Sequence, residues 1–225
     1  DRAAKLKAEI DSAGLKVWSV HMPYSRKIDI SLADSAKRAD VVSYMKDMLR
    51  VAGVFQPENI VLHPSSEPIT PDEREYRLQC SHESIGELAP VAKEIGATLC
   101  IENLPRTCLG QNGQEMMQLI EGYDEVGLCF DTNNLLYQSH EDYLKAVAKG
   151  KIKTVHISDY DFADERHLLP GVGKIDWKPL WDGIRKNGYK GIMMFECYGE
   201  PSELADARDL LRGKIIPQKS NIDAD

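Results

Sequence analysis

Short apolar segments alternate with longer amphipathic segments along this chain, and that alternation restricts its fold more than any other feature. Six apolar segments, rich in Val, Ile and Leu, have the character of buried strands. The segments between them carry apolar residues at helical spacing. Repeated strand–helix units predict a parallel sheet with helical crossover connections. The expected strands are residues 16–21, 59–63, 98–102, 126–131, 153–157 and 192–196, and the expected helices are residues 2–13, 34–52, 71–95, 113–122, 141–150, 177–187 and 201–212.

Glycine follows several expected helices just before the next strand. A glycine at this place adopts the left-handed conformation that ends a helix without a steric penalty. We therefore expect helix stops at Gly14, Gly53, Gly96, Gly150 and Gly188.

A polar residue stands at or near the end of every expected strand. In a doubly wound sheet these ends spread along an edge, whereas in a (β/α)8 barrel they converge on one mouth, where catalytic groups collect. No GxGxxG sequence follows the first strand, so a dinucleotide-binding fold lacks its main support. The pattern favours the barrel. The residues concerned are His21, His63, Glu102, Asp131, His156 and Glu196.

The number of strands is smaller than a full barrel requires. Six are visible in 225 residues, and the chain opens on a helix, whereas a complete barrel takes about 250 residues. We therefore expect a single α/β domain over residues 1–225, a (β/α)8 barrel that lacks its first one or two βα units. Such a barrel exposes two strand edges, which a homodimer could cover.

Composition narrows the environment and the partners. The chain has 28 Lys and Arg against 36 Asp and Glu, a net charge of −8, which disfavours nucleic acid as a partner. No apolar run approaches the length of a membrane span, so we expect no membrane association. The five cysteines are scattered without a CxxC pair, as in a cytoplasmic protein with reduced thiols.

Four of the strand-end residues together suit a divalent metal ion. Glu102, Asp131, His156 and Glu196 supply three carboxylates and one imidazole from four successive strands. This set is typical of Mn²⁺, Mg²⁺, Co²⁺ or Zn²⁺ sites rather than thiolate sites. Any one of them alone could be a salt-bridge partner or a helix cap, but three close carboxylates would repel one another without a cation.

Two further histidines and one loop carry candidate substrate contacts. His21 and His63, also at strand ends, could bind a substrate hydroxyl or a second metal, or simply hydrogen-bond to neighbouring loops. Arg166 and His167 begin a loop with one proline and two glycines after the fifth strand. Arginine there could hold a phosphate or an anionic intermediate, while the alternative is an ordinary exposed loop.

In order along the chain, these motifs resemble the xylose isomerase-like TIM-barrel superfamily, which includes sugar (phosphate) isomerases and epimerases and the type 2 AP endonucleases. The matching segments are HMPY at His21, HPSS at His63, IEN at Glu102, FDTNN at Asp131, VHISD at His156, HLLPGVGKIDW at His167 and FE at Glu196.

The resemblance implies that the visible strands are the third to eighth of the barrel. It also implies one divalent metal ion held by Glu102, Asp131, His156 and Glu196, with Glu102 and Glu196 as catalytic residues that move the proton on a sugar. The implied substrate-binding residues are His21, His63, Asn134, Arg166 and His167.

Two positions depart from the endonuclease pattern. Asn134 stands where the family commonly has a histidine, and Glu165 stands where the endonucleases have an aspartate. Both changes disfavour a three-zinc site.

The function expected from residues and resemblance is a metal-dependent sugar isomerase or epimerase that transfers a proton next to a carbonyl group. A phosphodiesterase of the AP-endonuclease type and a non-catalytic sugar-binding relic of the fold are the alternatives.

Overall fold

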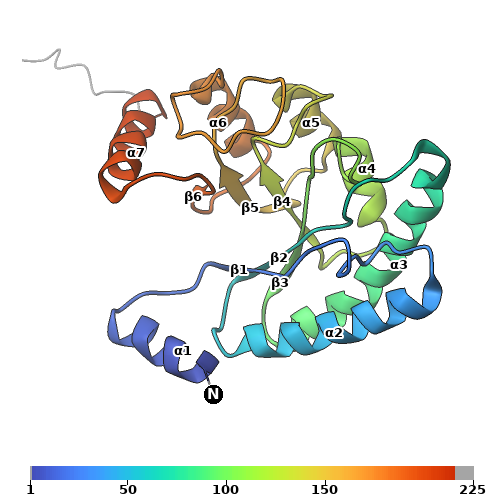
Figure 1. Cartoon of the computed structure of the whole chain (residues 1–225). Helices are drawn as coiled ribbons and strands as arrows, with labels where there is room; N and C mark the ends of the chain where they lie inside the picture. The colour runs from blue at the N-terminus through green and yellow to red at the C-terminus, as the bar shows by residue number, and fades with distance from the viewer. Residues whose placement is uncertain (1, 216–225) are drawn as a thin grey trace, which may run out of the picture.

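The computed structural model describes residues 2–215 (Figure 1). Strands and helices alternate through this whole range, as the sequence predicts. The strands are β1 (Ser19–His21), β2 (Asn59–Leu62), β3 (Thr98–Glu102), β4 (Gly127–Asp131), β5 (Ile152–Ile157) and β6 (Met194–Phe195). The helices are α1 (Arg2–Ser12), α2 (Ser35–Gly53), α3 (Pro71–Glu94), α4 (Gly113–Leu119), α5 (His140–Ala146), α6 (Trp177–Lys186) and α7 (Pro201–Ile215).

The six strands form one parallel sheet in the order β1-β2-β3-β4-β5-β6. Each strand therefore pairs with its neighbour in sequence, as in a βα barrel, and the sheet is a half-barrel. Within residues 2–215, β1 is paired only with β2, and β6 only with β5. This confirms the predicted partial (β/α)8 barrel of six strands.

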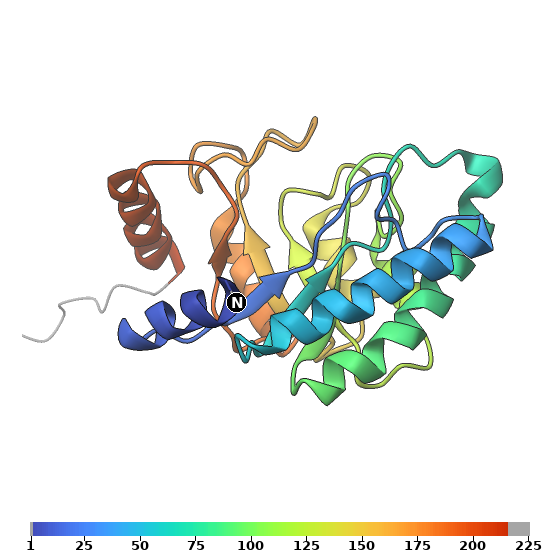
Figure 2. The ribbon, with the colours of Figure 1, turned by 60° about the horizontal axis from the view of Figure 1, so that its bottom comes forward.

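The main hydrophobic core lies between the outer face of the sheet and the helices that cover it (Figure 2). Because successive strand residues point to opposite faces, every second residue joins this core. Ile60 and Leu62 of β2 point outward, and both are almost completely buried. Helices α2 and α3 contribute Met45 and Leu88 to the same cluster.

A second, smaller cluster fills the inside of the half-barrel. It consists of Val61, Cys100 and Cys129, one residue from each of β2, β3 and β4. The indole of Trp18, just before β1, donates a hydrogen bond of 3.1 Å to Oγ1 of Thr154 on β5. This bond links the edge of the sheet at β1 to β5 across the interior.

Four of the five predicted helix-stop glycines have the expected left-handed backbone. Gly14, Gly96, Gly150 and Gly188 all have positive φ angles, and Gly53 does not. Gly53 instead ends α2, where a Cβ would lie only 2.9 Å from the Ile95 side chain. A close approach between α2 and the end of α3 therefore accounts for glycine at this position.

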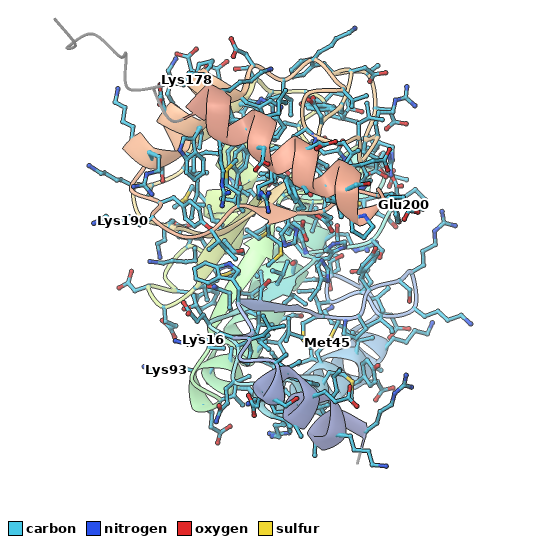
Figure 3. The ribbon with its side chains drawn as sticks, turned by 90° about the vertical axis from the view of Figure 1, so that its left-hand side faces the viewer. Lys16, Met45, Lys93, Lys178, Lys190 and Glu200 are labelled. Carbon is cyan, nitrogen blue, oxygen red and sulfur yellow. The ribbon has the colours of Figure 1, made fainter. Side chains whose placement is uncertain are left out.

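The two edges of the sheet are less buried than its centre. The residues of β1 and β6 are half-buried, whereas β2 is buried throughout. Helix α1 buries no side chain, while α7 packs on α6. Figure 3 views the molecule from the side on which α1 and α7 lie. No helix within residues 2–215 combines the length and the apolarity needed to cross a membrane.

Candidate metal and substrate site

The carboxyl ends of the strands meet around a cavity of about 310 Å³. The parallel order of the sheet brings these ends together, because every strand points its last residue toward the same edge. Of the residues predicted from the sequence, His63, Glu102, Asp131, Asn134, His167 and Glu196 line the cavity.

Glu102, the last residue of β3, lies at the centre of the site and is almost completely buried. Its Oε1 lies 2.8 Å from Nδ1 of His156, and its Oε2 lies 3.0 Å from Nε2 of His21 and 3.2 Å from Nε2 of His63. Burial opposes ionisation, but the charge of His156 and the hydrogen bonds from all three imidazoles outweigh it. They hold the pKa of Glu102 well below its usual range.

Asp131 and Glu196 complete a group of three carboxylates around His156. Nδ1 of His156 also lies 2.8 Å from Oε2 of Glu196. One ligand atom from each of Glu102, Asp131, His156 and Glu196 falls within 4.8 Å of the others. The structure therefore brings the four predicted metal ligands together.

Asp131 is only partly satisfied by hydrogen bonds. Its Oδ1 accepts a 2.6 Å hydrogen bond from the backbone N–H of Asn133. Its Oδ2 is buried and has no hydrogen-bond partner in the part of the chain that is described. Burial and the nearby charges of Glu196 and Glu102 raise the pKa of Asp131 well above its usual range.

These residues fit a bound divalent cation. Three carboxylates and one imidazole form a donor set that such ions prefer. A cation would also neutralise the repulsion that raises the pKa of Asp131 and would give its free Oδ2 a partner. A second group, His21, His63 and Glu102, has ligand atoms equally close together and shares the Glu102 carboxylate.

His21 is not among the residues that line the cavity. Its Nδ1 lies 2.8 Å from the carbonyl oxygen of Met22, while its Nε2 faces Glu102. Both ring nitrogens thus face acceptor oxygens, which favours the protonated ring. Burial lowers the pKa of His21. The hydrogen bond and the charge of Glu102 raise this pKa by more than burial lowers it, so the net shift is upward.

His63 faces the cavity and is covered by Tyr24. The two rings are stacked with centroids 4.0 Å apart and an interplanar angle of 27°. Tyr24 lies on the loop after β1 and lines the cavity. Tyr24 was not among the residues predicted from the sequence, although it stands three residues after His21 in the HMPY segment.

The predicted residues of the β4–α5 loop are held by backbone contacts. The Asn103 side chain accepts from the N–H of Asp131 at 2.8 Å and donates to its carbonyl oxygen at 3.0 Å. Nδ2 of Asn134 donates to the Asn103 carbonyl at 3.1 Å. The buried Oδ1 of Asn134 has no partner among the described residues. Asn103 thus fixes both β4 and the loop that carries Asn134.

The β5–α6 loop brings one of its two candidates to the cavity. His167 lines it, with Nδ1 3.0 Å from the Glu196 carbonyl oxygen. The Arg166 side chain instead pairs with Asp161 of the same loop at 3.1 Å and is not among the lining residues.

Asp159 holds this loop in shape. Its buried carboxylate accepts hydrogen bonds from the N–H groups of Gly171 and Ile175 and from the Trp177 indole, at 2.8, 3.0 and 3.1 Å. Asp159 was not among the residues predicted from the sequence, although it ends the VHISD segment.

A three-loop ion cluster forms another part of the cavity wall. The Arg106 guanidinium lies 3.0 Å from Glu67, 2.9 Å from Asp164 and 2.8 Å from Glu165. These residues come from the β2–α3, β3–α4 and β5–α6 loops. No periodic pattern marks them, so the sequence offered no sign that they meet.

Comparisons with known proteins agree with this fold. A family described as "Xylose isomerase-like TIM barrel" matches residues 1–214. An inosose dehydratase of Lacticaseibacillus casei is 28% identical over 165 residues, covering 64% of this chain and 54% of that protein. The chain spans about half to two thirds of the length of the first curated relatives that it matches.

Solved structures of low sequence identity share the fold. A D-tagatose 3-epimerase-like protein has a TM-score of 0.82 at 20% identity, covering 93% of this chain and 80% of that one. The IOLI protein with a binding zinc atom has a TM-score of 0.73 at 17% identity, covering 94% and 78%. With six parallel strands in sequential order and a family match over almost its whole length, this chain belongs to the xylose isomerase-like TIM barrel family.

Proposed function

We propose that this chain carries the active site of a divalent-metal-dependent sugar isomerase or epimerase. The observation that carries the proposal is the convergence of Glu102 and Glu196 on one imidazole. These glutamates come from non-adjacent strands, and each places a carboxylate oxygen 2.8 Å from Nδ1 of His156. Two carboxylates so placed can act as a base and an acid at one substrate carbon.

Glu102, Asp131, His156 and Glu196 would hold the metal ion. When bound, a divalent cation supplies a Lewis acid that polarises a carbonyl group and acidifies the neighbouring C–H. One of the two glutamates then accepts the proton from carbon, and the other returns a proton to the substrate. The low pKa of Glu102, set by its three imidazole neighbours against the effect of burial, keeps it ionised at neutral pH.

The remaining lining residues suit a small polyhydroxy substrate. A volume of about 310 Å³ is at the lower end for ligand pockets. His63, His167 and Asn134 offer imidazole and amide groups that can hydrogen-bond to hydroxyls. The D-tagatose 3-epimerase-like protein among the structural neighbours and the inosose dehydratase among the relatives support a substrate of this kind. His21 acts through Glu102 rather than at the cavity surface, and Arg166 acts at most through its loop.

A second candidate is a phosphodiesterase with more than one metal ion. It is favoured by the group of His21, His63 and Glu102, which could hold an additional ion. Asn134 in place of a third-site histidine and the net charge of −8 weigh against it. This candidate predicts cleavage of an abasic-site oligonucleotide by the zinc-loaded protein.

Proton exchange tests the proposal directly. The Mn²⁺-loaded protein is incubated with ketoses in deuterated water, and deuterium incorporation at carbon is followed by NMR. We expect incorporation by the wild type and none by the Glu102→Gln, Glu196→Gln double variant. Glu121→Gln removes an exposed carboxylate far from the cavity and serves as the matched control. Equal incorporation by the double variant and the wild type would contradict the assignment of these glutamates.

A further inference from the structure

The cavity wall carries more acidic than basic side chains. Five carboxylates line the cavity, on Glu67, Glu102, Asp131, Glu165 and Glu196, against two arginines. Around Arg106, the carboxylates of Glu67, Asp164 and Glu165 face a single guanidinium, so this part of the wall has more acidic than basic groups. A cavity with this balance repels an additional dianion.

Arg106, one of the two lining arginines, is already paired with several carboxylates. Arg106 has three carboxylate partners within 3.0 Å, one from each of Glu67, Asp164 and Glu165. Its guanidinium also donates from Nε to both oxygens of Glu67, at 3.1 and 3.3 Å. A phosphate could bind here only by displacing carboxylates that come from two different loops, β2–α3 and β5–α6.

Arg26, the second lining arginine, offsets little of the negative charge of the cavity wall. Arg26 is exposed on the loop after β1, and its Nε donates a 3.0 Å hydrogen bond to the Glu67 carbonyl oxygen. Its charge therefore stands beside the residue that also binds Arg106. Arg166, a third cation near the site, is paired with Asp161 outside the lining.

We infer that the substrate of this site is an uncharged monosaccharide or polyol-derived ketone, and that phosphorylated and carboxylated sugars are excluded by the carboxylates around Arg106. The inference rests on the proposed function, since it concerns the same cavity and metal ligands. In this account Glu67 and Glu165 are specificity-determining residues. They neutralise the Arg106 guanidinium, which could otherwise bind an anion.

Equilibrium dialysis of the Mn²⁺-loaded protein tests this inference. The probes are radiolabelled D-fructose and D-tagatose and the 6-phosphate of each, with a protein-free blank to correct for metal bound by the phosphate. At low ionic strength we expect each neutral ketose to bind at least about tenfold more tightly than its phosphate. Added salt should narrow this ratio, because ions screen the repulsion.

Charge-removing variants sharpen the test. Glu165→Gln and the Glu67→Gln, Glu165→Gln pair should raise the affinity for the phosphates several-fold relative to the neutral sugars, because each frees Arg106 and removes negative charge. Glu121→Gln, which removes one exposed charge elsewhere, should leave the ratio unchanged. The salt dependence of the wild type needs no variant and remains decisive if a variant folds poorly.

Two results would overturn the inference in distinguishable ways. Equal or tighter binding of a phosphate, together with deuterium exchange into sugars, would refute the substrate class and leave the proposed function intact. Binding of neither neutral sugars nor phosphates by a protein that holds its metal would refute both.

Discussion

The inside of the half-barrel and its mouth are built from the same strands, but one is lined by apolar side chains and the other by charged ones. Val61, Cys100 and Cys129 fill the interior with small apolar groups that are completely buried. Two residues further along β3 and β4, Glu102 and Asp131 crowd carboxylates into an equally buried space. One region is packed for stability, while the other holds Asp131, whose ionised form destabilises the metal-free fold. Such local conflict marks a functional site.

The largest effect on stability should come from the packed region. Leu88 of α3 is completely buried in the main core, so Leu88→Ala removes apolar contacts and leaves a cavity. We expect a loss of about 2–5 kcal/mol in the free energy of unfolding. Chemical denaturation measures it, with Leu6→Ala on the exposed face of α1 as the control. Metal stoichiometry at low temperature should stay unchanged, and a loss of metal in the folded variant would contradict the separation of the two regions.

A smaller loss of stability is expected when the β5–α6 loop, which borders the mouth, is altered at Asp159. Asp159→Asn replaces one acceptor oxygen of a buried carboxylate that accepts from Gly171, Ile175 and Trp177. The new NH₂ group would face donors, at a cost of about 1–3 kcal/mol. Denaturation against Asp124→Asn, an exposed turn residue, checks this value. Limited proteolysis should also locate new cleavage between residues 160 and 176, and an unaltered cleavage pattern would argue against a loop held by Asp159.

Replacing Asp131 is expected to increase, rather than decrease, the stability of the metal-free protein. Its pKa is raised by burial and by Glu196 and Glu102, so its ionised form destabilises the metal-free fold as pH rises from the unfolded pKa through the folded one. Asp131→Asn should stabilise the metal-free protein at neutral pH by about 1 kcal/mol and flatten this pH dependence. Denaturation in the presence of a chelator measures both. If the variant is less stable than the wild type and its stability depends on pH to the same extent, repulsion between the buried carboxylates does not destabilise the metal-free fold.

The smallest signal is the proton released when metal binds. Because burial and neighbouring carboxylates favour the protonated form of Asp131, a cation must displace that proton. Metal affinity should therefore increase with pH, with release of up to about one proton. Calorimetry in two buffers of different ionisation enthalpy gives the number. Identical heats in both buffers would mean that Asp131 is already ionised in the metal-free protein.

The sequence predicted the strand ends better than the loops between them. The β3 strand has the predicted bounds, residues 98–102, because a continuous apolar run coincides there with burial on both faces of the sheet. The edge strands are shorter than predicted: β1 covers three residues and β6 two. An edge strand has hydrogen-bond partners on one side only, so apolar character alone overestimates its length.

The same contrast holds for the site. Glu102, Asp131, His156 and Glu196 could be found because each lies at or next to the end of a strand, and parallel strands bring their ends together. Arg106, Glu67 and Glu165 lie on loops whose paths no periodic pattern determines. Their contact depends on how three loops fold over the mouth, which requires the three-dimensional structure.

The most direct test of this account is the metal content of the folded chain. The purified protein is equilibrated with trace Mn²⁺, Co²⁺, Mg²⁺ and Zn²⁺, dialysed, and analysed by elemental analysis beside Glu196→Gln. The account predicts about one divalent ion per chain in the wild type. In the variant, the affinity for the metal should fall by more than about a hundredfold, because replacing a residue that only supports a ligand costs about tenfold to a hundredfold. A folded wild-type chain without bound metal would contradict the account, and two or three zinc ions per chain would favour the phosphodiesterase instead.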